Sequence, residues 1–208
     1  VLSNYDDYIV HEIDRKNLFQ MGQQWLGESF DITSQKTISM RFDNIDTAYP
    51  VSITTRAVAS SVHPTSMDVS IGSQSIYSLG FGATSQYIWA RERKESENYD
   101  ASSDKFDIKL SYTNNGDAAA KAYLDYIEII GKKKLNATDK QFSFRNFEMI
   151  NNNIPISFKL QNASKIYNLW DVTDPITPKR ISNQSSGNEF TFTVQGGRLN
   201  EYVVLSTE

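Results

Sequence analysis

The chain of 208 residues contains no cysteine. Disulfide bonds, thiolate metal sites and a cysteine nucleophile are therefore excluded from the chain itself. The compartment stays open, because a cysteine-free protein is compatible with oxidising and with reducing surroundings. Histidine is scarce as well, and His11 and His63 are too far apart in sequence to form a local metal site. We interpret His63, which precedes Pro64, as a surface loop residue.

Several signals of function are also missing. The sequence has no phosphate-cradling glycine loop, no nucleophile elbow and no HExxH zinc motif, and its serines lack a paired base. A formal net charge of -4 offers no basic face for nucleic acid. No apolar run approaches the roughly 20 residues that span a bilayer. We expect a non-catalytic chain without a membrane span, cut from a longer processed protein, since Val1 is not an initiator methionine.

What the sequence does contain is β-strand patterning. Apolar residues alternate with polar ones in most segments of the first 130 residues, as in half-buried strands. Residues 123–130 are apolar on both faces, which is typical of a central strand in a two-layer sandwich. We expect residues 91–100 to form a charged loop that follows a short strand at 87–90. The other expected strands are 37–43, 51–59, 67–71, 76–81 and 106–112.

A domain boundary is indicated at Gly131 and the lysine triplet that follows it. Beyond it the expected strands are shorter and separated by regular turn signals: 142–149, 154–160, 166–172, 190–194 and 202–205. The predicted fold is therefore all-β, with two antiparallel β-sandwich domains. Residues 1–131 form a jelly-roll-like sandwich, and residues 132–208 form a smaller, Ig-like sandwich.

Two carboxylates are candidate metal ligands. Glu28 and Asp125 could converge across the first sandwich, and calcium prefers oxygen ligands of this kind. The alternative is that Glu28 caps a turn, while Asp125 faces solvent or pairs with an arginine. Calcium needs 6–8 oxygens and the sequence names few of them. A structural calcium ion is the sole cofactor that we consider.

Aromatic residues suggest a binding surface. Trp25, Tyr87, Trp89, Tyr123 and Tyr126 are candidates for a sugar-stacking platform, because flat amphipathic rings suit stacking next to polar groups, and the first three are the binding residues that we predict. The alternative is that these rings lie in the core or pair across strands, which is the commoner fate of aromatics in β-proteins. Trp89, beside the charged segment, is the ring that we expect to be most exposed.

The run Leu169-Trp170-Asp171-Val172-Thr173-Asp174-Pro175 reads as a buried strand that a proline then ends. Together with the segments 25–30 and 123–129 and the closing strand 201–205, this run resembles the N-terminal, pre-catalytic region of gingipain-like cysteine peptidases. Among these enzymes, the resemblance is to those that act as sortases in the type IX secretion of Bacteroidetes, and other gingipain-like peptidases with the same N-terminal region stay open. The resemblance covers most of the chain, from about Trp25 onward.

The resemblance implies a cell-surface protease that removes C-terminal signals from secreted cargo. In that family the nucleophilic cysteine and its histidine lie in a domain after the equivalent of Glu208, so His63 does not match and no catalytic residue is carried over. Implied partners are the downstream peptidase domain and other secretion components, at the outer-membrane surface. The segments 91–100 and 174–178 are candidate docking elements.

Two other functions remain open. One is a pair of carbohydrate-binding modules in a surface glycan-processing protein, which an exposed aromatic platform would favour. Buried aromatics would favour the scaffold of a peptidase instead. The other is a free-standing adhesin or structural surface protein.

Overall fold

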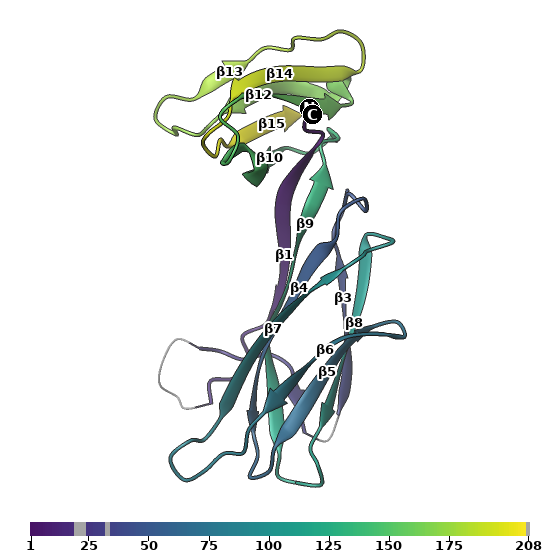
Figure 1. The fold of residues 1–208 in the computed structure, drawn as a ribbon, viewed down its shortest axis with the longest axis vertical. Helices are drawn as coiled ribbons and strands as arrows, with labels where there is room; N and C mark the ends of the chain where they lie inside the picture. The colour runs from purple at the N-terminus through teal and green to yellow at the C-terminus, as the bar shows by residue number, and fades with distance from the viewer. Residues whose placement is uncertain (19–23, 32–33, 207–208) are drawn as a thin grey trace. The chain divides into compact units, whose positions relative to one another are not determined.

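A computed structural model describes residues 1–18, 24–31 and 34–206 of the chain (Figure 1). Within these residues the secondary structure consists of strands and two single-turn 3-10 helices, which confirms the all-β prediction. No helix of the described residues is long and apolar enough to cross a membrane. The first nine strands are β1 (Asn4–Glu12), β2 (Ser29–Phe30), β3 (Gln35–Arg41), β4 (Val51–Ser60), β5 (Thr65–Ile71), β6 (Gln74–Phe81), β7 (Arg91–Tyr99), β8 (Lys105–Thr113) and β9 (Lys121–Lys134). They are followed by β10 (Phe142–Phe144), η1 (Phe147–Met149), β11 (Pro155–Gln161), η2 (Ala163–Lys165), β12 (Ile166–Asp171), β13 (Lys179–Ile181), β14 (Glu189–Gln195) and β15 (Tyr202–Ser206).

The chain divides into two compact units. Unit 1 comprises Val1–Asp7, Asn44–Asp46 and Gly131–Glu208, and unit 2 comprises Tyr8–Asp43 and Thr47–Ile130. We expected residues 1–131 to form one domain, but the N-terminal residues 1–7 belong to unit 1 together with the C-terminal part of the chain. They join unit 1 because the amide of Leu2 donates to the carbonyl of Ser157, and because Tyr5 is buried in the core of that unit. A local sequence pattern carries no information on such a distant partner.

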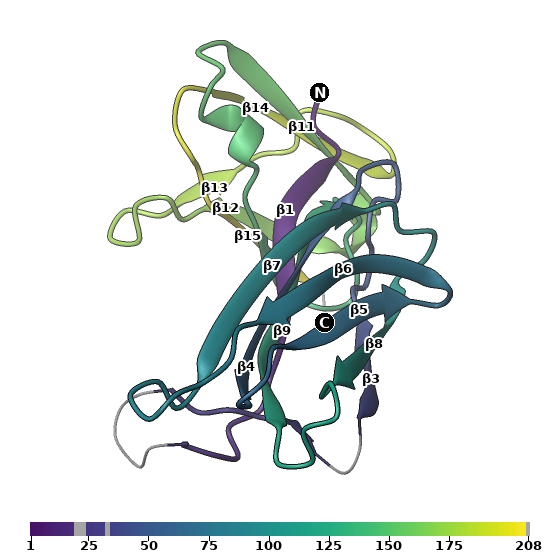
Figure 2. The same cartoon turned by 60° about the horizontal axis from the view of Figure 1, so that its bottom comes forward.

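Unit 2 is built from two antiparallel sheets. One has the order β1-β9-β4-β7, with β2 paired to β9, and the other has the order β3-β8-β5-β6 (Figure 2). The strands of the second sheet alternate between buried and exposed residues, as the sequence predicts for half-buried strands. Their buried residues include Met67, Phe81, Phe106 and Ile108. This hydrophobic interior fixes the sheets that carry the loops described below.

The segment 87–100 is the clearest correction to the sequence analysis. Residues 91–100 were expected to be a loop, yet Arg91–Tyr99 form strand β7, which pairs with β4 over nine residues, while 87–90 is loop rather than strand. The strand carries no apolar alternation because it lies at the end of its sheet. On the side away from β4, the Nε atoms of Arg91 and Arg93 donate to the carbonyls of Ala83 and Gly80.

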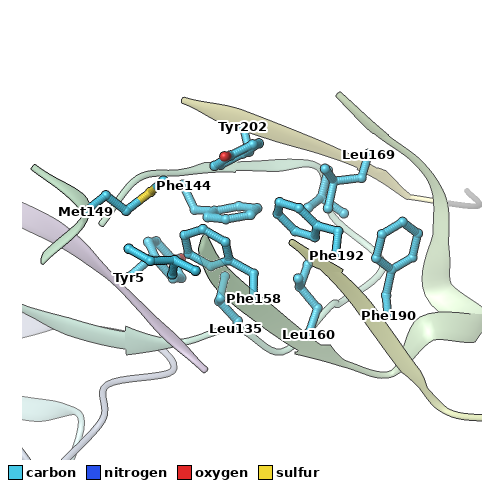
Figure 3. Close-up of a cluster of buried hydrophobic side chains, with 12 residues drawn as sticks. Tyr5, Leu135, Phe144, Met149, Phe158, Leu160, Leu169, Phe190, Phe192 and Tyr202 are labelled. Carbon is cyan, nitrogen blue, oxygen red and sulfur yellow. The ribbon is translucent and has the colours of Figure 1, made fainter. Parts of the chain in front are cut away.

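Unit 1 contains a four-stranded sheet, β10-β15-β12-β13, and a two-stranded sheet, β11-β14. Its core is rich in aromatic rings (Figure 3). The ring of Phe158 stacks 5.2 Å from that of Phe192 and makes edge contacts with Phe144 and Tyr202. Edge-to-face and offset-stacked pairs add stability to that of simple burial. A core of this kind explains how a unit with short strands holds together.

The polar side chains of the turn that follows β12 form hydrogen bonds within the turn itself. Asp171 accepts a hydrogen bond from the amide of Thr173, and Asp174 accepts from the amide of Ile176 and from the hydroxyl of Thr177. The hydroxyl of Thr173 in turn accepts from the amide of Glu201. The polar residues of this turn are thus used to close it, which is the usual role of aspartate and threonine at such positions.

Candidate functional site

Three aromatic side chains that the sequence analysis named lie exposed on unit 2. The exposed fraction is 86% for Tyr87, 65% for Trp89 and 46% for Trp25. We call these three residues the aromatic patch. Tyr87, and not Trp89, is the most exposed of them, contrary to expectation. Exposed large rings that gather in one region commonly mark a binding surface.

The loop that carries Tyr87 and Trp89 is held in a defined shape. Ser85 and Ile88 exchange two backbone hydrogen bonds, of 2.9 and 3.1 Å, and so form a tight turn. Inside this turn the amide of Tyr87 donates to the hydroxyl of Ser85, and the indole N–H of Trp89 donates to the carbonyl of Gln86. The indole therefore uses its polar atom within the loop, and its apolar ring contributes to the surface.

The residue that follows Trp25 in the sequence packs close to the residue that follows Trp89. Leu26 forms a small buried cluster with Val58 and Tyr123, and Ala90 packs against this cluster. Trp25 precedes Leu26 and Trp89 precedes Ala90, so the backbone that carries each indole lies beside the same cluster. Two tryptophans that are far apart in the sequence are therefore brought to the same part of unit 2.

Lys16 contacts both Tyr123 and the segment of Trp25. The Nζ of Lys16 donates to the hydroxyl of Tyr123 at 3.0 Å and lies 5.0 Å from the centre of the same ring. The backbone of Lys16 also pairs with that of Leu26 through two hydrogen bonds. A cation held over a ring stabilises the ring electrostatically. Lys16 thus fixes both Tyr123 and the segment that carries Trp25.

The second support of Trp25 is a network of polar side chains around Gln24. Its amide nitrogen donates to Asp125 at 3.1 Å and to Glu92 at 3.3 Å. Arg56 joins the same two carboxylates, at 3.2 Å from Asp125 and 2.6 Å from Glu92. The hydrogen bond from Arg56 lowers the pKa of the Glu92 carboxyl, and the same bond raises the pKa of Arg56. These four residues connect the segment of Trp25 to strands β4, β7 and β9.

The two predicted calcium ligands are thus engaged in separate pairs. Asp125 faces the guanidinium of Arg56, which places a positive charge where a cation would bind. The Nε2 atom of His11 donates to Oε1 of Glu28 at 2.9 Å, and the buried Oε2 of Glu28 has no hydrogen-bond partner. Among the described residues no group of three or more acidic, histidine or cysteine side chains is arranged to hold a metal ion. Asp125 fits the alternative, in which it pairs with an arginine, whereas Glu28 pairs with His11 and was expected in that alternative to cap a turn. Calcium binding stays a prediction.

Sequence reasoning did not find Gln24, Arg56 or Glu92. Arg56 and Glu92 lie on the adjacent strands β4 and β7, where register brings them together, and the sequence analysis had assigned the segment of Glu92 to a loop. Gln24 lies in a segment without strand patterning. The one available signal was the outward position of Arg56 in an alternating strand.

Comparisons with known proteins give the fold. No family model matches the chain, and a search of curated proteins finds no match. Among solved structures, dimeric latent PorU from Porphyromonas gingivalis matches 99% of this chain with a TM-score of 0.77 and 18% identity. The matched part is 20% of the PorU chain, so this chain spans about a fifth of that protein's length.

Carbohydrate-binding modules give weaker matches. A CBM36 module in complex with calcium and xylotriose matches 59% of this chain and 98% of its own, with a TM-score of 0.38 and 19% identity. A CBM36 domain of a xylanase from the hindgut metagenome of Trinervitermes trinervoides matches 60% of this chain and 95% of its own, with a TM-score of 0.38 and 16% identity. Likenesses of this size support no conclusion about ligands. The fold of this chain is that of the matched part of PorU, across both units.

Proposed function

We propose that this chain is a non-catalytic scaffold region of a gingipain-like cell-surface cysteine peptidase, the sortase of type IX secretion. The observation that carries the proposal is the match to PorU, because it covers nearly the whole of this chain and one fifth of a much longer protein. The absence of cysteine is consistent with it, since the peptidase nucleophile would have to lie elsewhere in the parent protein.

In this role the two units support the downstream peptidase domain and present loops to secretion components at the outer-membrane surface. Loops on a rigid β-scaffold suit such a task. The aromatic patch is the element of unit 2 best suited to docking, since its rings are exposed and its loop is held by hydrogen bonds. The turn at Asp174 is less suited, because its carboxylate is used within the turn.

The test is an immunoblot of fractionated native cells with an antibody raised against this chain. A band several times larger than 23.6 kDa in the outer-membrane fraction supports the proposal. A band near the size of the chain itself would contradict it and would favour a free-standing surface protein. The purified chain should also show no peptidase activity, with or without a thiol reductant, and reproducible hydrolysis by a clean sample would overturn the scaffold assignment.

A second candidate function is glycan binding by unit 2. The specific observation in its favour is the exposure of Trp25, Tyr87 and Trp89 at one end of the unit. Affinity electrophoresis of the chain through gels that contain soluble polysaccharides tests it. Retardation that Tyr87→Ala removes, and that Tyr49→Ala leaves unchanged, would establish the site, because Tyr49 is also exposed but lies outside the patch. Equal migration in every gel would dismiss this function.

A further inference from the structure

Unit 1 contains a polar cavity that neither proposed function uses. It has a volume of about 280 Å³ and lies where strand β13 ends beside β12. Six of the residues that line it are Tyr167, Asn168, Arg180, Ile181, Ser182 and Phe190. We call it the Asn168 pocket. Its volume is close to the lower limit of small-molecule sites, so it suits one ring or one side chain.

The walls of the Asn168 pocket are fixed by local structure. Leu169 pairs with Ile181, so the same register places Asn168 opposite Ser182, one residue beyond the end of β13. A bulge next to Tyr167 turns that ring outward, and 67% of it is exposed. On the far side Asn183 accepts hydrogen bonds from the amides of Ser185 and Thr191, which fixes the course of the chain after β13.

Arg180 is the charged residue of the lining. Within the described part of the chain, its guanidinium takes part in none of the ion pairs. The carboxylate of Glu189, the residue before Phe190 of the lining, is bound to Lys159 at 2.6 Å and to Gln161 at 3.3 Å. The pocket is therefore positive on a chain whose formal net charge is -4. A guanidinium binds a carboxylate through two parallel hydrogen bonds, so an anionic ligand fits best.

Asn168 supplies a second, independent feature. Its Oδ1 atom is buried and has no hydrogen-bond partner. A buried acceptor without a donor is unfavourable, and most such atoms in proteins are satisfied by a protein group, by water or by a ligand. Asn168 also lines the pocket, so a ligand that enters the pocket can reach the amide oxygen once this side chain turns toward the opening. An O–H or N–H donor on a ligand would then satisfy it.

We propose that the Asn168 pocket binds a uronic acid, that is, a six-membered sugar ring that carries a carboxylate. The carboxylate lies against Arg180, a ring hydroxyl donates to Oδ1 of Asn168, and the exposed ring of Tyr167 packs on the sugar face. Half of the lining residues have polar side chains, namely Asn168, Arg180, Ser182 and Asn183, and the hydroxyls of a sugar match them better than an apolar amino-acid side chain does. This site is in unit 1 and is separate from the aromatic patch of unit 2.

The test is a titration of the isotope-labelled 208-residue chain with D-glucuronic acid, followed by amide chemical shifts. D-glucose is the matched ligand, because it differs from glucuronic acid in having a hydroxyl in place of the carboxylate. We expect shifts at Tyr167, Asn168 and Arg180 with the acid, and an affinity for glucose at least about tenfold weaker. N-acetyl-leucine tests the alternative that the pocket takes a peptide carboxylate.

Two variants decide the role of the pocket. Arg180→Gln should weaken glucuronic acid binding at least about tenfold. Lys179→Gln should not, because it makes the same charge change on the adjacent residue of β13, which does not line the pocket. An unchanged affinity of Arg180→Gln, no shifts with glucuronic acid at millimolar concentration, or tighter binding of N-acetyl-leucine would each overturn the proposal. Far-UV circular dichroism of both variants verifies that the fold is kept.

Discussion

The Nη1 atom of Arg56 lies 3.2 Å from the Oδ2 atom of Asp125, whose side chain is almost completely buried. This pair connects strand β4 to β9 and, through Gln24, to the segment that carries Trp25. A carboxylate that the sequence suggested as a calcium ligand is thus neutralised by a side chain of the protein.

Replacement of Arg56 by methionine should destabilise unit 2. The change leaves the buried carboxylate of Asp125 with the amide of Gln24 as its remaining side-chain partner, and we expect a loss of about 2 kcal/mol in the free energy of unfolding. Urea denaturation followed by circular dichroism measures it. Arg41→Met is the control, because Arg41 forms ion pairs with Asp43 and Asp104 at the exposed surface and should have little effect. Equal losses in the two variants would contradict this account of Asp125.

Replacement of Gly196 by alanine should destabilise unit 1. A Cβ atom at this position would overlap the carbonyl oxygen of Asn152 and come within 3.0 Å of that of Ile154. Backbone atoms cannot move aside cheaply, so we expect a loss of about 3 kcal/mol. Gly80→Ala is the matched control, since nothing lies within 4 Å of its added Cβ atom. A thermal unfolding midpoint that falls for Gly196→Ala and not for Gly80→Ala would confirm this prediction, and a fall of similar size in both would refute it.

The core of unit 1 should be most sensitive at Phe158. This ring is fully buried and contacts Phe144, Phe192 and Tyr202, so Phe158→Ala should cost about 4 kcal/mol through lost burial and the cavity that remains. Phe147→Ala should cost less than about 1 kcal/mol, because nearly half of that ring is exposed. Hydrogen exchange of the amides in β11 and β14 reports the loss directly. Similar exchange rates in the two variants would show that the aromatic core is not the main source of stability.

Tyr202 should make the stability of the chain fall at alkaline pH. Burial raises the pKa of its hydroxyl to about 12, above the value of 10.0 for an exposed tyrosine. Between these values the unfolded chain loses a proton that the folded chain keeps. The contribution is therefore fully present below pH 10 and lost as the pH rises toward 12, with a slope of up to about 1.4 kcal/mol per pH unit.

Tyr202→Phe isolates this contribution. Its free energy of unfolding should decline less steeply than that of the parent chain between pH 10 and 11, whatever constant difference the lost hydrogen bond to Asn200 adds. Parallel curves over that range would show that Tyr202 titrates alike in both states. Tyr77, whose pKa burial also raises to about 12, remains in both proteins and cancels in the comparison.

Alternating residues made most of the strands predictable from the sequence. The segment 105–113 is an example, since its apolar residues face the core of unit 2 and its polar residues do not. The segment 91–99 could not be predicted in this way, because every residue of β7 is at least partly exposed and no alternation results. Its pairing with β4 depends on backbone hydrogen bonds, which polar and apolar residues form equally well.

The candidate binding residues were likewise only partly predictable from the sequence. Trp25, Tyr87 and Trp89 could be named from their chemistry alone, but their position at one end of unit 2 depends on Leu26 and Ala90 sharing a cluster with Val58. The pairing of Asp125 with Arg56 likewise depends on the register of β4 and β9, in which Arg56 is opposite Tyr126 and Ala57 is opposite Leu124, so that Asp125 is the extra residue of a bulge. The spacing of residues in a single sequence does not predict the register between such distant strands.

Arg91 and Arg93 have a consequence for aggregation. The guanidinium of Arg93 donates to the carbonyl of Gly80 on strand β6, and that of Arg91 donates to the carbonyl of Ala83, two residues beyond the end of β6. Strand β7 runs next to β6 without a backbone ladder (Figure 2). A strand from another molecule would have to displace two charged side chains before it could pair there. The chain thus protects an otherwise open sheet margin from amyloid-like strand addition by means of arginine side chains.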